Sequence, residues 1–147
     1  EAKDYMERYF ATYPGVKQYM TDIVEKAKEQ GYVETLYHRR RALPELRSAN
    51  FVQRAFGERV ALNMPIQGTA ADIMKLAMLR VYDRLRRENL QARLIMQVHD
   101  ELIVECPEAE RETVEKLLRQ EMEQVAALAV PLTAEAHSGK NWLEAKG

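Results

Sequence analysis

The sequence contains a single cysteine, Cys106, so it cannot form an internal disulfide, and a reducing compartment is the expected setting. No apolar run approaches the roughly 20 residues that a membrane-spanning helix needs, so we expect no contact with a membrane. The net charge is −1, so the overall charge by itself gives no signal for a nucleic-acid partner. The first residues lack an initiator methionine and the apolar core of a signal peptide, and they resemble the inside of a helix. We therefore expect a piece of a longer chain.

What the sequence does contain is typical of one globular domain. Its 147 residues are 46% hydrophobic and 31% charged, enough to bury a sizeable core. The charges are unevenly distributed. Residues 38–59 hold six arginines against two glutamates, whereas residues 105–123 hold seven glutamates against three basic residues. This asymmetry predicts one face that meets an anion and another that meets solvent.

Apolar periodicity and breaker residues predict an α+β fold. We expect a helix over 1–12, a breaker at 13–15, and a second helix from there to about residue 30. A hairpin with strands at 32–37 and 42–44 and a turn at 38–41 should follow, and then a helix from 48 to 65. Pro65 and Gly68 should end that helix, and Thr69 should cap a new one that runs to residue 88. Strands at 93–98 and 102–106, a helix over 107–128 and a strand at 130–136 should follow. The antiparallel sheet should be covered by helices on one side.

The strongest local signal for chemistry is the turn His99-Asp100-Glu101 between two apolar strands. Leu94, Met96 and Val98 should face a core, and the rigid hairpin would then present two carboxylates at its tip. Fixed carboxylate oxygens suit a divalent cation. Aspartate is also a common turn residue that needs only water, so the turn by itself leaves both interpretations open.

A second signal is the row formed by Arg59, Asn63 and Gln67, which are spaced four residues apart. On a helix they share one face, although Pro65 makes the alignment of Gln67 the least secure. Such side chains can reach the minor-groove acceptors that every base pair presents, and so test duplex geometry rather than sequence. A solvated polar helix face is the alternative.

The run Arg39-Arg40-Arg41 at the tip of the first hairpin is a third signal. Arginines in this position can hold phosphates. They can equally serve only to keep the surface soluble.

Two stretches together resemble a known family. They are Glu58-Arg59-Val60-Ala61-Leu62-Asn63-Met64-Pro65-Ile66-Gln67-Gly68-Thr69-Ala70-Ala71-Asp72-Ile73-Met74-Lys75 and Gln97-Val98-His99-Asp100-Glu101. They are similar to the C-terminal fingers and palm segments of family A DNA polymerases, the bacterial DNA polymerase I group. The likeness extends to Gly31-Tyr32-Val33-Glu34-Thr35 and Gly139-Lys140-Asn141-Trp142, and so covers nearly the whole chain. His38 departs from the pattern, because the family usually has a turn glycine there.

The resemblance implies roles for individual residues. Asp100 matches the aspartate that binds the catalytic metals, and Glu101 matches its assisting neighbour. His99 matches a residue near the primer terminus. Arg59, Asn63 and Gln67 match residues that touch the minor groove of the duplex.

The resemblance also implies what this chain lacks. The family's second metal aspartate, its nucleotide-binding fingers helix, the thumb and any exonuclease domain would all lie upstream of Glu1. We therefore expect about residues 1–68 to derive from the fingers and 69–147 from the palm. Half of a two-metal Mg²⁺ site would be present, and the fragment alone would be inactive.

The expected function is a part of a DNA-directed DNA polymerase acting in bacterial replication or repair, in the cytoplasm at the nucleoid. Its partners would be primer–template DNA, deoxynucleoside triphosphates and the remainder of the polymerase chain. Single-subunit RNA polymerases of phages are related, but His99-Asp100 followed by Glu101 favours DNA synthesis. Two alternatives are a non-catalytic duplex DNA-binding module and an interaction domain that uses its acidic helix at 108–128.

Overall fold

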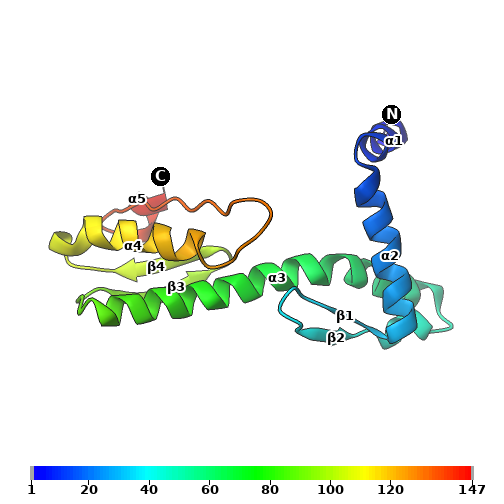
Figure 1. Ribbon diagram of the computed structural model, residues 1–147, viewed down its shortest axis with the longest axis horizontal. Coiled ribbons are helices and arrows are strands. Elements are labelled where there is room, and N and C mark those ends of the chain that lie inside the picture. The colour runs from blue at the N-terminus through cyan, green and yellow to red at the C-terminus, as the bar shows by residue number, and fades with distance from the viewer. Residues whose placement is uncertain (1, 147) are drawn as a thin grey trace. The chain divides into compact units, whose positions relative to one another are not determined.

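The computed structural model describes residues 2–146, which form two compact units that meet in sequence between Ala70 and Ala71. The architecture is α+β, as the sequence predicts, with two separate two-stranded antiparallel sheets in the described residues rather than the single expected sheet (Figure 1). None of the helices described is long and apolar enough to span a membrane.

The first unit contains two helices, a hairpin and the start of a long helix. The elements are α1 (Ala2–Thr12), α2 (Pro14–Gln30), β1 (Tyr32–Glu34), β2 (Arg40–Ala42), the 3-10 helix η1 (Pro44–Arg47) and the first half of α3 (Phe51–Arg87). Gly31 ends α2 in the left-handed conformation, with φ of 82°, as expected for a helix stop. A small core holds the unit together, made of Ala27, Val33, Leu43, Leu46 and Ala61.

Helix α3 is continuous, so the expectation of two helices separated at Pro65 and Gly68 was wrong. Proline removes one N–H from the helix and weakens that turn. Residues on either side of it are nevertheless fixed by packing: before it, Ala61 is fully buried and Met64 packs against the same core, and after it Thr69 is buried. Thr69 lies inside the helix and caps nothing; its hydroxyl donates to the carbonyl of Pro65 at 2.5 Å. Tertiary contacts therefore override the local helix-breaking signal.

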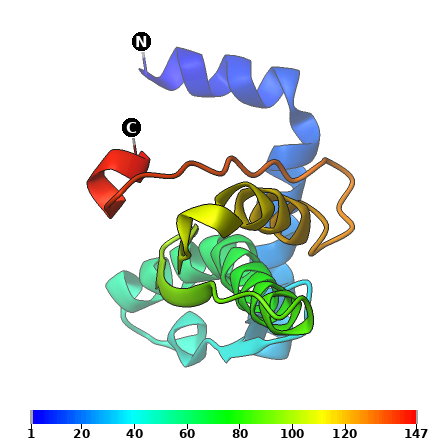
Figure 2. The same cartoon turned by 90° about the vertical axis from the view of Figure 1, so that its left-hand side faces the viewer.

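The second unit combines the end of α3 with a hairpin and a second long helix. Its remaining elements are β3 (Arg93–Val98), β4 (Glu101–Glu105), η2 (Glu108–Glu110), α4 (Arg111–Glu123) and α5 (Trp142–Lys146). Helix α4 lies beside the second half of α3 (Figures 1 and 2). The shared core is formed by Val81, Leu85, Ala92, Val114 and Leu117. Leu102 and Val104 of β4 pack against it, so helices cover one side of this hairpin, as expected.

Several expectations for the second unit were wrong in detail. The hairpin is less buried than its apolar sequence indicates, since Met96 is 41% exposed and Leu94 only half-buried. A bulge between Leu94 and Met96 breaks the simple alternation of faces. Helix α4 ends at Glu123 rather than near residue 128. Just after its end, Arg80 donates a hydrogen bond to the carbonyl of Gln124 at 2.5 Å.

The predicted strand at 130–136 is absent, because no strand of the described chain pairs with it. Its burial still alternates, with half-buried Leu132, Ala134 and Ala136 separated by exposed residues. The period-2 pattern therefore reports which side chains face the protein, and it does not by itself create a hydrogen-bonded ladder.

Candidate functional site

The β3–β4 turn is shorter than predicted. Val98 pairs with Glu101, so Glu101 is the first residue of β4 and only His99 and Asp100 form the loop. His99 has φ of 50°, the positive value that tight two-residue hairpins favour at the first loop position. The side-chain amide of Gln97 donates to the His99 carbonyl at 2.7 Å. These contacts give Asp100 a fixed backbone position at the hairpin tip.

The two neighbouring carboxylates of this turn have different environments. Asp100 is exposed and has no hydrogen bond or ion pair with any residue between 2 and 146. Glu101 is half-buried, and its Oε1 lies 3.5 Å from Nζ of Lys146. Its Oε2 is buried without a hydrogen-bond partner among the described residues. An open carboxylate beside a partly desolvated one is suited to a cation that brings its own water ligands.

Lys146 was not singled out in the sequence, although a local signal pointed to the element that carries it. Asn141 accepts from the Glu144 backbone N–H at 3.0 Å and donates to Glu144 Oε1 at 2.8 Å. The first contact is an N-cap hydrogen bond that starts α5, and the Glu144 carboxylate also accepts the backbone N–H of Lys140 at 3.0 Å. The helix then places Lys146 near Glu101 and within 5.5 Å of the Trp142 ring centre. The pairing joins segments far apart in sequence, which spacing alone does not reveal.

The row on α3 is regular because the helix is continuous. Arg59, Asn63 and Gln67 are all exposed, at the four-residue spacing that places them along one face. The guanidinium of Arg59 lies 5.9 Å from the ring centre of Phe56, which is itself 44% exposed. The amides of Asn63 and Gln67 make no hydrogen bond within residues 2–146, so their donors and acceptors face solvent.

The arginines at the first hairpin are exposed, but most of them bond to other groups of the chain. Arg39 donates to the carbonyl of Gly68 at 2.9 Å. Arg40 lies in β2, donates to Glu34 at 3.2 Å and lies 4.6 Å from the Tyr32 ring centre. That hydrogen bond, opposed by partial desolvation, lowers the pKa of Glu34. Two of the three arginines are therefore engaged with this chain itself, and the run is not a free phosphate-binding cluster.

Comparison with known proteins identifies the family. The model of DNA polymerase family A matches residues 1–144. The chain belongs to DNA polymerase family A. It is 56% identical over 146 residues to DNA polymerase I of Geobacillus stearothermophilus and 52% identical to that of Bacillus subtilis, covering 99% of this chain and 17% of each relative. The chain thus spans about a sixth of the length of these relatives.

A solved structure of the family has the same fold. The chain is similar to the POL domain of Pol1 from M. smegmatis, solved in complex with a DNA primer-template and dNTP. The TM-score is 0.96 at 44% identity, over 100% of this chain and 26% of that one. The resemblance stated from the motifs is confirmed, as is the α+β fold class.

Within this family A chain, the predicted site residues fall into two sets. The row Arg59, Asn63 and Gln67 belongs to the first unit, and the turn that carries His99, Asp100 and Glu101 belongs to the second. No group of three or more histidine, cysteine, aspartate or glutamate side chains in the described residues could hold a metal ion. The turn can therefore contribute a carboxylate to a metal site without forming a complete one by itself.

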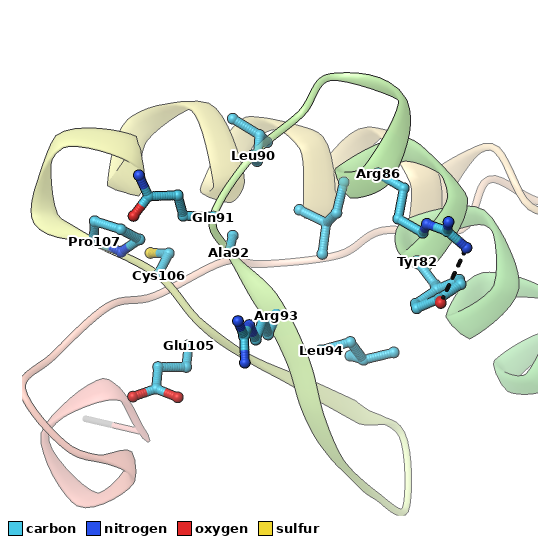
Figure 3. A pocket seen from close by; sticks show the side chains of 11 residues that line it. Tyr82, Arg86, Leu90, Gln91, Ala92, Arg93, Leu94, Glu105, Cys106 and Pro107 are labelled. Atoms are coloured by element: carbon cyan, nitrogen blue, oxygen red, sulfur yellow. Dashed lines mark hydrogen bonds between the residues drawn. The ribbon is translucent and has the colours of Figure 1, made fainter.

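A hollow of about 930 Å³ lies at the base of the β3–β4 hairpin, where Leu90, Arg93 and Cys106 are among the lining residues (Figure 3). Arg86, at its rim, donates to the Tyr82 hydroxyl at 3.3 Å. Burial, followed by the charges of nearby glutamates, raises the pKa of the Cys106 thiol. A thiol held neutral is a poor nucleophile and metal ligand. The residues of the β3–β4 turn do not line this hollow, so it is separate from the candidate carboxylates.

Proposed function

We propose that this chain is the catalytic-carboxylate and duplex-contacting part of a DNA-directed DNA polymerase that acts in bacterial replication or repair, in the cytoplasm at the nucleoid. The observation that carries the proposal is the exposed Asp100 carboxylate, held by a two-residue turn in a chain that matches family A over nearly its full length. Similarity to a domain that was solved with a primer-template and dNTP supports primer–template DNA and deoxynucleoside triphosphates as the substrates.

In this assignment Asp100 would hold Mg²⁺ through its carboxylate, and Glu101 would assist from the adjacent position in β4. The bound metal would neutralise charge on the phosphates and favour attack by the primer 3′-hydroxyl. A carboxylate outside these 147 residues must complete a two-metal site, since the described residues supply no third ligand. His99, next to Asp100, would lie near the primer terminus.

Arg59, Asn63 and Gln67 would contact the minor groove of the primer–template duplex. Their exposed donors can reach the N3 and O2 acceptors that all base pairs share, so this contact would report the shape of a correct pair. Residues 1–68 would belong to the fingers and 69–147 to the palm, in a complex with the remainder of the polymerase chain.

The metal assignment is tested in the complete polymerase with Asp100→Ala. Primer extension should fall by orders of magnitude, and binding of Mn²⁺ measured by electron paramagnetic resonance should weaken in parallel. Asp83→Ala is the matched control, because Asp83 is an exposed aspartate in α3 whose side chain makes no hydrogen bond or ion pair with residues 2–146. Near-normal turnover in Asp100→Ala would refute the ligand role. The isolated 147 residues should not extend a primer, and measurable extension would show that the site is complete without a further carboxylate.

The minor-groove assignment is tested with Arg59→Ala and Asn63→Ala in the same polymerase. Each should weaken duplex binding by about 1–3 kcal/mol, the usual magnitude of a hydrogen-bonded base contact. Unchanged duplex affinity in both variants would remove the assignment. A different outcome would indicate a non-catalytic duplex-binding module. In that case the unmutated polymerase would bind the duplex, but it would bind no metal and extend no primer.

A further inference from the structure

The loop between β1 and β2 is fastened to α3 directly beside the row Arg59, Asn63 and Gln67. Thr69 is the centre of this attachment and is only 7% exposed. Its hydroxyl donates to the Pro65 carbonyl at 2.5 Å and accepts the backbone N–H of Leu36 at 3.0 Å. One side chain thus joins the loop to the helical turn that contains the proline.

A second contact lies one residue earlier, at Gly68. Arg39 donates to its carbonyl at 2.9 Å. A Cβ atom at Gly68 would lie 2.7 Å from Cγ2 of Thr35 and 3.3 Å from Nη2 of Arg39. Only glycine allows the loop to approach the helix this closely, because 2.7 Å is well inside van der Waals contact. The motif residues Gly68 and Thr69 are therefore both explained by the loop that contacts them.

The loop itself is stiff enough to act as a support. Thr35 is 3% exposed, and its hydroxyl accepts the backbone N–H groups of Tyr37 and Arg39 at 3.2 Å each. The backbone of Thr35 also accepts from the N–H of His38 and donates to the carbonyl of Arg39, at 3.0 Å each. Four hydrogen bonds within five residues leave the loop little freedom.

The attachment lies where the helix is intrinsically weakest. Pro65 falls between Asn63 and Gln67 and cannot donate to the carbonyl one turn earlier. The helix ladder therefore restrains Gln67 relative to Asn63 less than elsewhere in α3. The Thr69 and Arg39 contacts act on the two carbonyls that bracket Gln67, those of Pro65 and Gly68.

We propose that Thr69 and Arg39 are positioning residues that hold Gln67 in register with Asn63 for minor-groove contact. The inference rests on the proposed function, because it gives the loop a role only if Gln67 touches DNA. A hydrogen bond to a base edge needs a donor–acceptor distance of about 2.7–3.2 Å and weakens steeply when the bond angle becomes poor. A looser turn at Pro65 would therefore impair Gln67 while leaving Asn63 and Arg59 in place.

The test compares three variants of the complete polymerase. Thr69→Val removes the hydroxyl at nearly constant volume, Thr69→Ser keeps it, and Thr21→Val is the matched control. Thr21 donates to the Lys17 carbonyl four residues back, at 3.2 Å, without a second hydrogen-bond partner among the described residues. In Thr69→Val, kcat/KM for extending a matched primer terminus should fall about 3- to 10-fold, because the one hydrogen bond that Gln67 donates to the base would be lost. Extension of a mismatched terminus should fall less, so discrimination declines.

Thr69→Ser should restore the matched rate to within about twofold, and Thr21→Val should leave it unchanged. Arg39→Gln should act in the same direction as Thr69→Val. Arg41→Gln is its charge-matched control, since the side chain of Arg41 makes no hydrogen bond or ion pair with residues 2–146. A lower melting temperature in Thr69→Val with an unchanged matched-to-mismatched ratio would reduce the attachment to a purely structural one and overturn the proposal.

Combination with Gln67→Ala separates this inference from the function on which it rests. If Thr69 acts through Gln67, Thr69→Val should change the matched-to-mismatched ratio by no more than about twofold when Gln67 is already alanine. Full additivity of the two substitutions would overturn the positioning role and leave the minor-groove assignment intact. A Gln67→Ala variant with normal duplex binding and discrimination would overturn both.

Discussion

Glu110 fixes the start of the strand that leads to Asp100, and its removal is the most informative stability experiment. The two oxygens of its carboxylate accept the backbone N–H groups of Gln91 and Ala92, each at 2.9 Å. Ala92 is 6% exposed, so its N–H would lose its partner where water enters poorly. A hydrogen bond to a charged group contributes about 1.5–3 kcal/mol. Because Glu110 is only half-buried, we discount the pair to about 2–4 kcal/mol for Glu110→Ala.

The assay can use the single tryptophan, Trp142, as a reporter of the second unit. Urea unfolding followed by its fluorescence should show a lower midpoint in Glu110→Ala with an unchanged slope. Hydrogen exchange at the Ala92 amide should be faster, and the loss of protection, converted to a free energy, should equal the loss of stability. Glu110→Gln, which keeps one acceptor oxygen, should lose roughly half as much.

Glu112→Ala provides the control, since Glu112 is exposed in the first turn of α4, just after Glu110. Its removal should cost no more than about 1 kcal/mol of helix-dipole interaction. Equal destabilisation by Glu110→Ala and Glu112→Ala would show that the loss reflects helix charge, and the bidentate contact would then have no special weight.

Three further predictions follow from single residues. His38→Gly should raise the melting temperature. Relief of the left-handed backbone at His38 (φ 63°) gains about 1–2 kcal/mol, whereas the added entropy of the unfolded chain costs about 0.4–1 kcal/mol. A lower melting temperature would contradict this. Cys106 should react with iodoacetamide more slowly than a free thiol near pH 8, because burial raises its pKa; stability from the neutral thiol is present below the ordinary thiol pKa and lost as pH rises through the raised one. The Glu34–Arg40 contact should stabilise the first hairpin above the ordinary carboxyl pKa and be lost as pH falls through the lowered pKa of Glu34; an NMR titration in Arg40→Gln should move that pKa back up.

Most elements could be predicted from the sequence because their signals are local. The glycine stop of α2 and the apolar run of β3 are properties of short segments, so the end of α2 and both bounds of β3 are as predicted. Helix α2 begins at Pro14, inside the expected breaker, because proline is tolerated in the first turn of a helix. Errors arose where a distant contact decides the outcome. Pro65 is tolerated because Ala61 and Met64 are packed, and residues 130–136 form no strand because no strand among residues 2–146 pairs with them.

The candidate site shows the same division. The residue types at the β3–β4 turn and in the row on α3 could be predicted, since each is a short motif. The ion pair of Glu101 with Lys146 and the attachment of Thr69 to Leu36 could not, because each joins segments that only folding brings together. The left-handed backbone of His38, with φ of 63°, had only an indirect signal, namely that the family usually has a turn glycine at this position.

The two-residue loop between Val98 and Glu101 restricts how this segment can vary in length. Side chains in a strand alternate between faces, so one inserted residue would invert every side chain of β4 relative to its partner strand. Leu102 and Val104 would leave the core, and Ile103 and Glu105 would replace them. The turn can therefore accept a changed side chain far more readily than a changed length. In a family of sequences it should appear as a gap-free stretch, even where the surrounding loops expand and contract.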